Sequence, residues 1–320
     1  MIDILLASYN GSKYIGEQIE SIIAQTNKEW KLMIHDDGSV DDTVCIVQEI
    51  ADAFNSKMLS QGDARRITVS ANPVPCGGAA ANFIGLLKAS ESDYVMFCDQ
   101  DDAWDHDKVE KSMRLMEKLE NKYGMSVPLL IYTDLAVTDE HLQMIAPSFI
   151  KYMKIPPSIH LPRLLMQNSV TGCTILMNKV LCKCLCKVNE PDHIVMHDHF
   201  AALTATVLGE VAFLPEATIK YRQHGNNSVG ASDARSFSYL WKRYKRGKKQ
   251  FRKDLYHSMV QAGYFYKLYR NEIRNPHWKK LIYAYSQLYQ KPKIYRIRFY
   301  FMNHVIKFGA VRALMQFVWG

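Results

Sequence analysis

Apolar runs alternate with helical repeats along the first 134 residues, and no other feature of the sequence limits the fold as strongly. Several runs, beginning with "IDILLAS", have the continuous apolar character of strands that are buried on both faces. These predicted strands cover residues 2–8, 30–35, 66–71, 93–98 and 129–134. Apolar residues recur at helical spacing in 13–25, 44–50, 80–89 and 105–122. The alternation predicts an α/β fold, with a mostly parallel sheet, helices on both faces and right-handed crossovers.

Polar residues, mostly acidic, follow one predicted strand after another. Ligands of such sheets bind beyond the carboxyl ends of the strands. Carboxylates packed this closely repel and raise one another's pKa unless a cation or hydrogen-bond donors offset the charge. A solvated Asp-rich turn is the alternative for a single strand end, whereas several such ends predict a ligand cleft. The residues are Ser8-Tyr9-Asn10, Asp36-Asp37, Asn72 and Asp99-Gln100-Asp101-Asp102.

Two common phosphate-binding motifs are missing from the sequence. The turn after the first strand reads "YNGSKYIG" and lacks the GxGxxG of a dinucleotide site, and no GxxxxGK[ST] loop occurs. A phosphate ligand that faces these carboxylates would therefore need a divalent metal, and aspartate oxygens suit Mg²⁺ or Mn²⁺.

Seven short motifs follow one another along the chain: "ASYNG", "IIAQT", "HDDGSVDDT", "FCDQDDAW", "NSVTGCTILMN", "MHDHF" and "YRQHGNN". In this order they resemble family 2 glycosyltransferases with the GT-A fold, which is Rossmann-like. The resemblance covers residues 1–230, the predicted catalytic domain, and it implies a nucleotide-diphosphate sugar donor, a divalent metal and inversion at the anomeric carbon. "CDQDDAW" with "YRQHGNN" is most similar to the bacterial rhamnosyltransferase-type branch, which builds surface polysaccharides.

The resemblance implies nucleotide-binding roles at the first two strand ends. Asp36 and Asp37 match the family's acidic pair, and Asp37 above all would accept a hydrogen bond from the imide N–H of uracil or thymine. Turn chemistry in "DDGS" is the alternative, and both can hold at once. Tyr9 would stack on the base, unless it is a core tyrosine, and Asn10 joins it in the predicted nucleotide site.

The resemblance also implies a metal site. Asp99 and Asp101 match the family's DxD, in which such acids hold the ribose and the metal diphosphate, so Asp99 is assigned to the nucleotide and Asp101 to Mn²⁺ or Mg²⁺. His224 would complete the metal shell or lie in a Gly-Asn turn. Asp102 is either a partner behind the site or the cap of the helix that begins near residue 105, and Trp104 is expected to pack under the loop.

Further motifs match the family's acceptor side and its base. Asn168, Thr171 and Gly172 lie where the family contacts the acceptor or the donor sugar, and Asp102 is grouped with them. Asp198 matches the catalytic carboxylate that deprotonates the acceptor hydroxyl, although the Trp that usually follows is shifted or lost in "MHDHF". Asp198 could instead cap a helix over 199–208, and its two flanking histidines are expected to be partly exposed.

The charge of the chain divides near residue 235. Residues 1–234 hold 20 Lys and Arg against 30 Asp and Glu, a net charge of −10, whereas residues 235–320 hold 20 against 2, a net charge of +18. A stripe at helical spacing predicts a basic amphipathic helical region over 235–320 that lies on an anionic membrane surface. Packing on the catalytic domain or in a homodimer is the main alternative, and nucleic acid is the least favoured partner. The stripe consists of Leu240, Tyr244, Phe251, Leu255 and Ala262.

Cysteine usage and targeting signals suggest a reducing compartment. Seven cysteines are an odd number, which does not suit a framework of disulfide bonds. The three cysteines in "CKCLCK" lack the spacing of zinc ligands and are expected to pack in a helix. The sequence shows neither a signal peptide nor an uncharged apolar run of about 18 residues. We therefore expect a cytoplasmic protein, peripheral on the inner face of the cell membrane. The reaction implied is sugar transfer to a saccharide or to a polyprenyl-diphosphate-linked acceptor. One alternative is a sugar-phosphate nucleotidyltransferase, but such an enzyme needs a Gly-rich phosphate loop near the N-terminus, and "ASYNGSKYIG" does not provide one. The other alternative is a non-catalytic membrane-associated binding protein.

Overall fold

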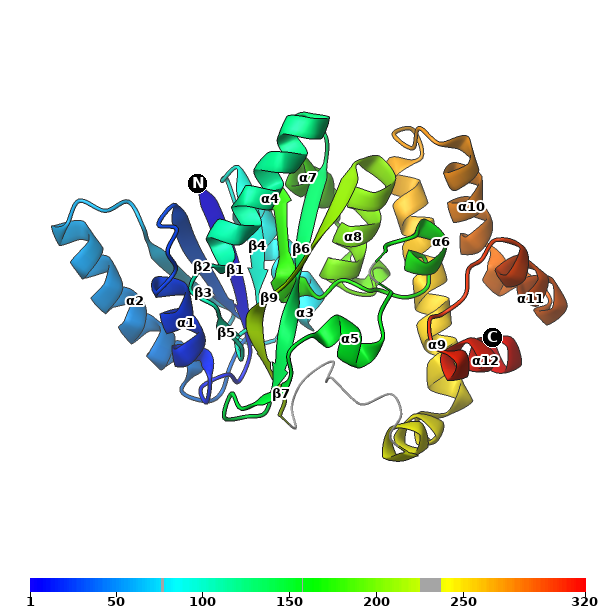
Figure 1. The fold of residues 1–320 in the computed structure, drawn as a ribbon, viewed down its shortest axis with the longest axis horizontal. Coiled ribbons are helices and arrows are strands. Elements are labelled where there is room, and N and C mark those ends of the chain that lie inside the picture. Colours follow the sequence, from blue (N-terminus) through cyan, green and yellow to red (C-terminus); the bar gives the residue numbers. More distant parts are fainter. Residues whose placement is uncertain (76–77, 157, 225–236) are drawn as a thin grey trace.

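A nine-stranded sheet lies at the centre of the computed structural model, and helices cover both of its faces (Figure 1). The structure describes residues 1–75, 78–156, 158–224 and 237–320, with side chains in the last range from residue 247 onward. The first half alternates strands and helices as expected from the sequence. Its elements are β1 (Ile2–Ser8), α1 (Ile15–Ile23), β2 (Trp30–Asp36), α2 (Thr43–Ser60), β3 (Ile67–Ala71), α3 (Gly78–Ala89), β4 (Tyr94–Cys98), β5 (Ala103–Trp104), α4 (Lys108–Tyr123) and β6 (Leu129–Thr138).

The second half adds three strands and several helices to the catalytic region, and after β9 the described chain is helical. Strand β9 lies between β6 and β5 in the sheet, and helix α8 carries part of the "MHDHF" motif. The elements are β7 (Met144–Ala146), α5 (Phe149–Met153), α6 (Leu161–Leu164), the 3-10 turn η1 (Gly172–Thr174), β8 (Ile175–Asn178), α7 (Lys179–Leu185), the 3-10 turn η2 (Pro191–His193), α8 (His197–Leu208), β9 (Glu210–Arg222), α9 (Phe237–Tyr269), α10 (Pro276–Ser286), η3 (Leu288–Gln290), α11 (Lys293–Met302) and α12 (Ala310–Trp319).

The strand order is β3-β2-β1-β4-β8-β6-β9-β5, and β7 pairs with β6. The pairs β1–β2, β1–β4, β2–β3 and β6–β9 are parallel, as right-handed crossovers require. The short strand β8 runs antiparallel between β4 and β6, so the sheet is parallel in its first half and mixed beyond β4. Because β8 is antiparallel to both neighbours, β4 and β6 still end at the same edge.

Alternation along β1 divides the core into two. Ile2, Ile4 and Leu6 face one apolar layer, which α1, α2 and α4 cover. Leu5 faces the other layer, which is covered by α3, α7 and α8. Strands that are apolar on both faces therefore lie inside a three-layer sandwich, which is what their continuous apolar runs predict.

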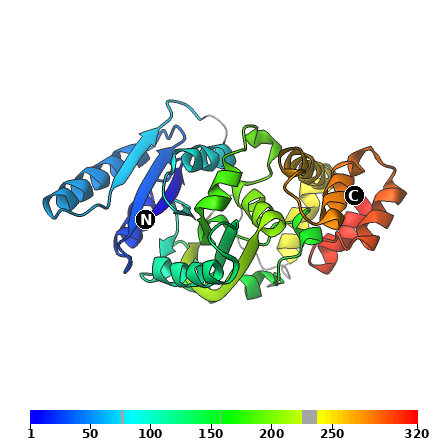
Figure 2. The ribbon, with the colours of Figure 1, turned by 90° about the horizontal axis from the view of Figure 1, so that it is seen from above.

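The C-terminal helices pack against the second layer and share its core. Phe251, Leu255 and Ala262 of α9 are buried together with Phe200 of α8. The predicted membrane-facing stripe thus faces the protein itself over its described part, and packing on the catalytic domain accounts for it; Leu240 and Tyr244 lie outside the described side chains. Figure 2 shows these helices at the end of the molecule opposite α2.

Candidate active site

The loops after β1 and β4 meet at the carboxyl edge of the sheet. Gln100 accepts a hydrogen bond from the backbone N–H of Tyr9 at 2.9 Å and donates one to the carbonyl of Tyr9 at 3.1 Å. A Cβ on Gly11 would lie 2.4 Å from Oε1 of Gln100, so glycine there leaves room for the Gln100 side chain between the two loops. The polar strand ends therefore lie together, as the sequence predicts.

The second strand end is tied into the same edge. Asp36 is buried, and its carboxylate accepts hydrogen bonds from the hydroxyls of Ser8 (2.8 Å) and Ser39 (2.6 Å) and from the backbone N–H of Gly38 and Ser39. Turn chemistry thus accounts for Asp36. Asp37 accepts from the side-chain amide of Asn72 at 3.1 Å, which joins the ends of β2 and β3.

Tyr9 and Asn10 project from this edge. The side chain of Tyr9 is 49% exposed, so Tyr9 is not a core tyrosine. Asn10 adopts a left-handed conformation (φ 49°), and its amide oxygen accepts from the backbone N–H of Val40 at 3.0 Å. Both residues border the turn that Asp36 holds.

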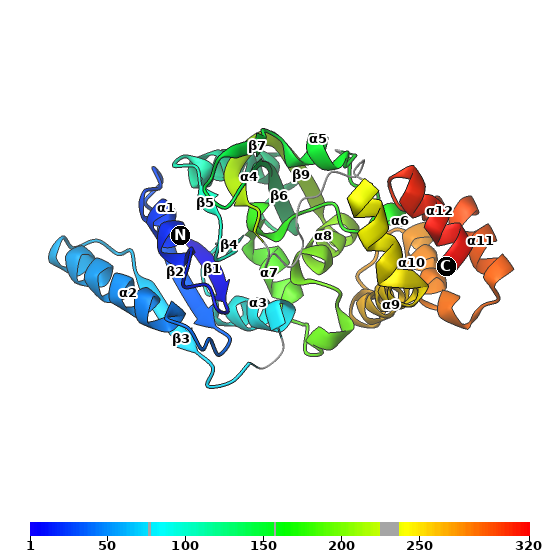
Figure 3. The same ribbon diagram turned by 90° about the horizontal axis from the view of Figure 1, so that it is seen from below.

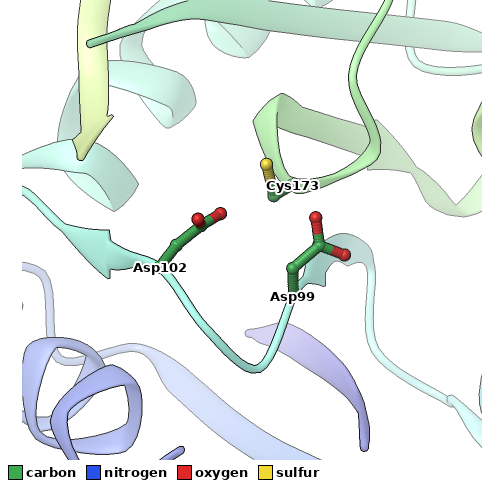
Figure 4. Close-up of side chains that lie close together, drawn as sticks. All are labelled: Asp99, Asp102 and Cys173. Atoms are coloured by element: carbon green, nitrogen blue, oxygen red, sulfur yellow. The ribbon is translucent and has the colours of Figure 1, made fainter. Parts of the chain in front are cut away.

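Two carboxylates and a thiol converge behind this edge. Ligand atoms of Asp99, Asp102 and Cys173 lie within 4.8 Å of one another (Figure 4). Burial, the charge of Asp101 and that of Asp198 raise the pKa of Asp99 to about 7. Burial and the charges of Asp101 and Asp99 hold the pKa of Asp102 well above its usual range. Cys173, which comes from η1, is a neighbour that the sequence analysis did not identify.

Asp101 and His224, the two predicted metal ligands, contact each other. Nε2 of His224 lies 2.8 Å from Oδ2 of Asp101. Arg222 supports the pair: it is buried, and its Nε donates to the carbonyl of Asp101 at 2.8 Å while its Nη2 meets Oε2 of Glu17 at 2.6 Å. The backbone N–H of Arg222 also donates to Oδ1 of Asp102 at 3.1 Å. Arg222 lies within "YRQHGNN", but the motif gave no sign of this role.

The two alternatives for Asp102 are resolved by the start of α4. That helix begins at Lys108 with Asp107 as its N-cap, so Asp102 does not cap it. Asp102 is fully buried, and within the described part of the chain its Oδ2 has no hydrogen-bond partner. Trp104 is buried beside it, as expected.

Asp198 lies in the first turn of α8. The helix begins at His197 with Met196 as its N-cap, so Asp198 is not the cap that the sequence allowed. Burial raises the pKa of Asp198 to about 6, although hydrogen bonds from the backbone of His199 and Gly172 and from the side chain of Asn168 lower it. Asn168 and Gly172, two of the predicted acceptor-side residues, therefore contact the predicted base.

The loop over 168–172 is held close to α8. Asn168 makes a local turn, donating to the carbonyl of Val170 at 2.7 Å, and the carbonyl of Thr171 accepts from Thr174. A Cβ on Gly172 would lie 3.0 Å from Nε2 of His197, which is tighter than side chains normally allow. Glycine at 172 thus permits the loop to contact the start of α8.

Both histidines beside Asp198 are buried, and the expectation that they are partly exposed is wrong. The ring of His197 stacks on Phe83 with centroids 4.0 Å apart, and burial lowers its pKa to about 3. Burial lowers the pKa of His199 to about 4, and its Nε2 contacts the carbonyl of Leu164. Both rings are neutral at pH 7, so they add no positive charge beside the carboxylate.

The donor set at the acidic edge fits a divalent cation. Lys108 is a buried positive side chain nearby, but its Nζ lies 4.7 Å from the ring centre of Trp104 and burial lowers its pKa to about 8. Its charge does not prevent the rise in the pKa of Asp99. Two groups of donors lie at this edge: Asp99 and Asp102 beside Cys173, and Asp101 beside His224. Their carboxylates and the imidazole are O and N ligands that Mn²⁺ or Mg²⁺ accepts.

A separate cavity of about 450 Å³ lies at the opposite end of the strands. Its walls include Glu210 at the start of β9, Tyr132 and Phe213 in the sheet, and Trp278 of α10. None of the predicted site residues lines it. The cavity is therefore separate from the carboxyl edge of the sheet, where the titratable groups converge.

Comparison with known proteins gives one family throughout. The family model described as "Glycosyl transferase family 2" matches residues 3–181. The dTDP-rhamnosyl transferase RfbG of Shigella flexneri is 29% identical over 254 residues, which cover 74% of this chain and 77% of RfbG. The UDP-Glc:alpha-D-GlcNAc-diphosphoundecaprenol beta-1,3-glucosyltransferase WfgD of Escherichia coli is 28% identical over 57% of this chain and 61% of WfgD.

Solved structures agree on the fold. The structure of S. aureus TarS 1–349 in complex with UDP-GlcNAc superimposes with a TM-score of 0.58 and 16% identity, covering 92% of this chain and 74% of that chain. At this identity the likeness concerns the fold, and it matches the GT-A architecture expected from the sequence.

Proposed function

Because the chain belongs to glycosyl transferase family 2, we propose that it is an inverting hexosyltransferase of bacterial surface polysaccharide synthesis. The donor is a UDP- or dTDP-linked sugar, with dTDP-rhamnose as one candidate, and the acceptor is a saccharide or a polyprenyl-diphosphate-linked sugar. The names of RfbG and WfgD support these donor and acceptor classes. The observation that carries the proposal is the buried carboxylate of Asp198, with a pKa of about 6, beside the loop over 168–172.

Asp198 acts as the general base. A carboxylate with a pKa of about 6 is ionised at neutral pH, yet it is basic enough to accept a proton from the acceptor hydroxyl as that oxygen attacks. Hydrogen bonds from Asn168 and Gly172 orient the carboxylate toward the acceptor. Attack on the face opposite the leaving diphosphate then inverts the anomeric centre.

The remaining predicted residues bind the donor. Asp37 accepts the imide N–H of the base, and its hydrogen bond from Asn72 orients the carboxylate for that contact. Tyr9 stacks on the base with its exposed ring, and Asn10 and Asp36 hold the turn around it. Asp99 contacts the ribose.

Asp101 and His224 would hold Mn²⁺ or Mg²⁺, with Asp102 and Asp99 behind them. When bound, such a cation neutralises charge on the donor's diphosphate and so makes it a better leaving group. Thr171 and Gly172 lie at the sugar, where a backbone without a side chain allows close approach.

The enzyme is proposed to work at the inner face of the cell membrane, as a peripheral protein or a homodimer, because polyprenyl-linked acceptors are held there. Within the described ranges, no helix combines the length and the apolar character that crossing a bilayer demands.

The base assignment is tested by replacing Asp198. The variant Asp198→Asn keeps the shape of the side chain but cannot accept the proton, so it should fold, bind the sugar nucleotide and lose at least about a hundredfold in transfer rate. Asp192→Asn, an exposed aspartate on η2, is the matched control and should transfer normally. Turnover by Asp198→Asn at the wild-type rate would remove Asp198 from the mechanism.

The same preparation separates the rival functions. A nucleotidyltransferase would release diphosphate from a nucleoside triphosphate and a sugar phosphate, whereas the proposed enzyme would not. A binding protein on the same fold would show no hydrolysis of the donor in the presence of Mn²⁺. A thermal-shift screen of UDP- and dTDP-sugars, with and without Mn²⁺, then identifies the donor class.

A further inference from the structure

Helices α11 and α12 expose apolar side chains although both helices belong to the folded C-terminal region. On α11, Ile294, Phe301 and Met302 are exposed at a spacing of seven and eight residues, which keeps them on one side of the helix. On α12, Leu314 and Val318 are exposed four residues apart. We call these five residues the α11–α12 face.

A hydrogen bond links the two helices. Nζ of Lys293, at the start of α11, donates to the carbonyl of Val318, near the end of α12, at 2.6 Å. The start of α11, where Ile294 lies, is thus tied to the end of α12, where Val318 lies. Figure 3 shows α11 and α12 side by side at the end of the molecule farthest from α2.

The segment of chain that carries the α11–α12 face is basic. Residues 273–320 include nine Lys and Arg and not one Asp or Glu. Lys291, Lys293 and Arg298 are exposed beside α11. Exposed tyrosines lie in the same region, at positions 283, 289 and 295. Tyrosine rings of this kind favour the boundary between lipid and water.

We propose that the α11–α12 face docks on the surface of an anionic lipid bilayer. The five apolar side chains would enter the headgroup layer, and the basic residues around them would meet lipid phosphates, as in helices that lie in a membrane interface. This deepens the membrane location proposed above by naming the surface that provides it.

A second copy of the chain fits this face poorly. In a two-fold dimer the same patch meets itself, so each acid-free basic region would face its own copy and the like charges would repel. An anionic bilayer supplies the opposite charge. The charge of the region therefore favours lipid over self-association.

The loop between α11 and α12 contacts the segment that leads to the acceptor side of the site. The backbone N–H of Phe308, between α11 and α12, donates to Oε1 of Gln167 at 3.1 Å, and Gln167 precedes Asn168 beside Asp198. A bilayer on this face would thus bring lipid-linked acceptors near the loop over 168–172. The contact connects the docking surface to the proposed chemistry.

Vesicle binding by the full chain, without sugar nucleotide, tests the inference separately from catalysis. Wild-type protein should sediment with vesicles of phosphatidylglycerol and phosphatidylethanolamine and bind them at least about tenfold more tightly than phosphatidylcholine vesicles. The variant Phe301→Ser/Leu314→Ser should weaken binding by at least about tenfold, because two apolar anchors are lost. Donor hydrolysis in solution should be unchanged.

A matched control keeps the test specific. Leu59 and Met125 lie elsewhere on the molecule and are 71% and 68% exposed, close to Phe301 at 71% and Leu314 at 63%. Leu59→Ser/Met125→Ser should bind vesicles as the wild type does. Equal loss in both variants, equal binding to neutral and anionic lipid, or a dimer in sedimentation that only Phe301→Ser/Leu314→Ser dissociates would each overturn the proposal. Failure of Asp198→Asn to lose activity would leave vesicle binding untouched, so the two proposals fail independently.

Discussion

The transfer rate should depend on pH because Asp198 is buried. Burial raises its pKa to about 6 against 3.8, so the carboxylate becomes protonated as the pH falls through about 6. A protonated carboxyl cannot accept the acceptor's proton, and the transfer rate should therefore be full above pH 7 and fall about tenfold per pH unit well below 6. The measurement is kcat at saturating donor, acceptor and Mn²⁺ between pH 4.5 and 8.

The control for this profile is donor binding over the same range. Binding by isothermal titration should weaken less steeply than kcat if Asp198 serves the chemical step alone. A flat kcat down to pH 5 would contradict the assignment of the base.

Single residues were predictable from the sequence where a motif marks them. Motifs predict Asp101, His224 and Asp198 as site residues, and in the structure Nε2 of His224 lies 2.8 Å from Oδ2 of Asp101. Cys173 and Arg222 were not found, because they reach the site only through pairing between strands that are distant in sequence. No local signal distinguishes them from ordinary core and strand residues.

At the scale of elements, Asn178 joins a helix to two strands. Its Oδ1 caps α7 by accepting from Leu181 at 3.1 Å and also accepts from Leu129 of β6 at 3.0 Å, while its Nδ2 donates to Val127 at 2.8 Å. The side chain is buried, so Asn178→Ala leaves these groups without water as a replacement. We expect a loss of about 2–3 kcal/mol in the free energy of unfolding, measured by urea denaturation.

Asn275 provides the matched comparison, because it caps α10 from an exposed position. Asn275→Ala should cost about 1 kcal/mol or less, since water replaces the lost acceptor. Equal losses in both variants would show that the link between α7, β6 and β8 adds nothing beyond a helix cap.

Elements with a clear period were predictable, and irregular ones were not. β1 covers the predicted residues, but α2 continues to Ser60 and β6 to Thr138, beyond the predicted ends. β9 was missed because "EVAFLPEATIKYR" contains Pro215 and Glu216, which interrupt its alternation. The pairing with β6 skips these two residues, passing from Leu214 to Ala217, and a proline that cannot donate is tolerated at such a bulge.

For the whole molecule, the charge boundary near residue 235 does not coincide with a boundary in the core. The sequence predicts two regions from the change in net charge from −10 to +18. The buried cluster nevertheless runs from α3 and α8 into α9, α10 and α11. The net charge of a region indicates which partners its surface attracts, whereas the packing of buried side chains determines which elements fold together. The sequence shows the charge directly, but it does not show the packing.

The shared core predicts that the catalytic and C-terminal regions unfold together. Phe265 of α9 is fully buried and packs edge-on against Phe200 of α8 with ring centroids 5.8 Å apart. Phe265→Ala removes contacts from both regions at once and should lower the free energy of unfolding by about 3–5 kcal/mol. The fluorescence of Trp278 on α10 and that of Trp30 and Trp104, each isolated by replacing the other tryptophans, should change at one lowered midpoint. Phe301→Ala on the exposed side of α11 should change the free energy of unfolding by less than about 0.5 kcal/mol. Two separate transitions, with only the helical one moved by Phe265→Ala, would mean that the basic helices form an independent unit.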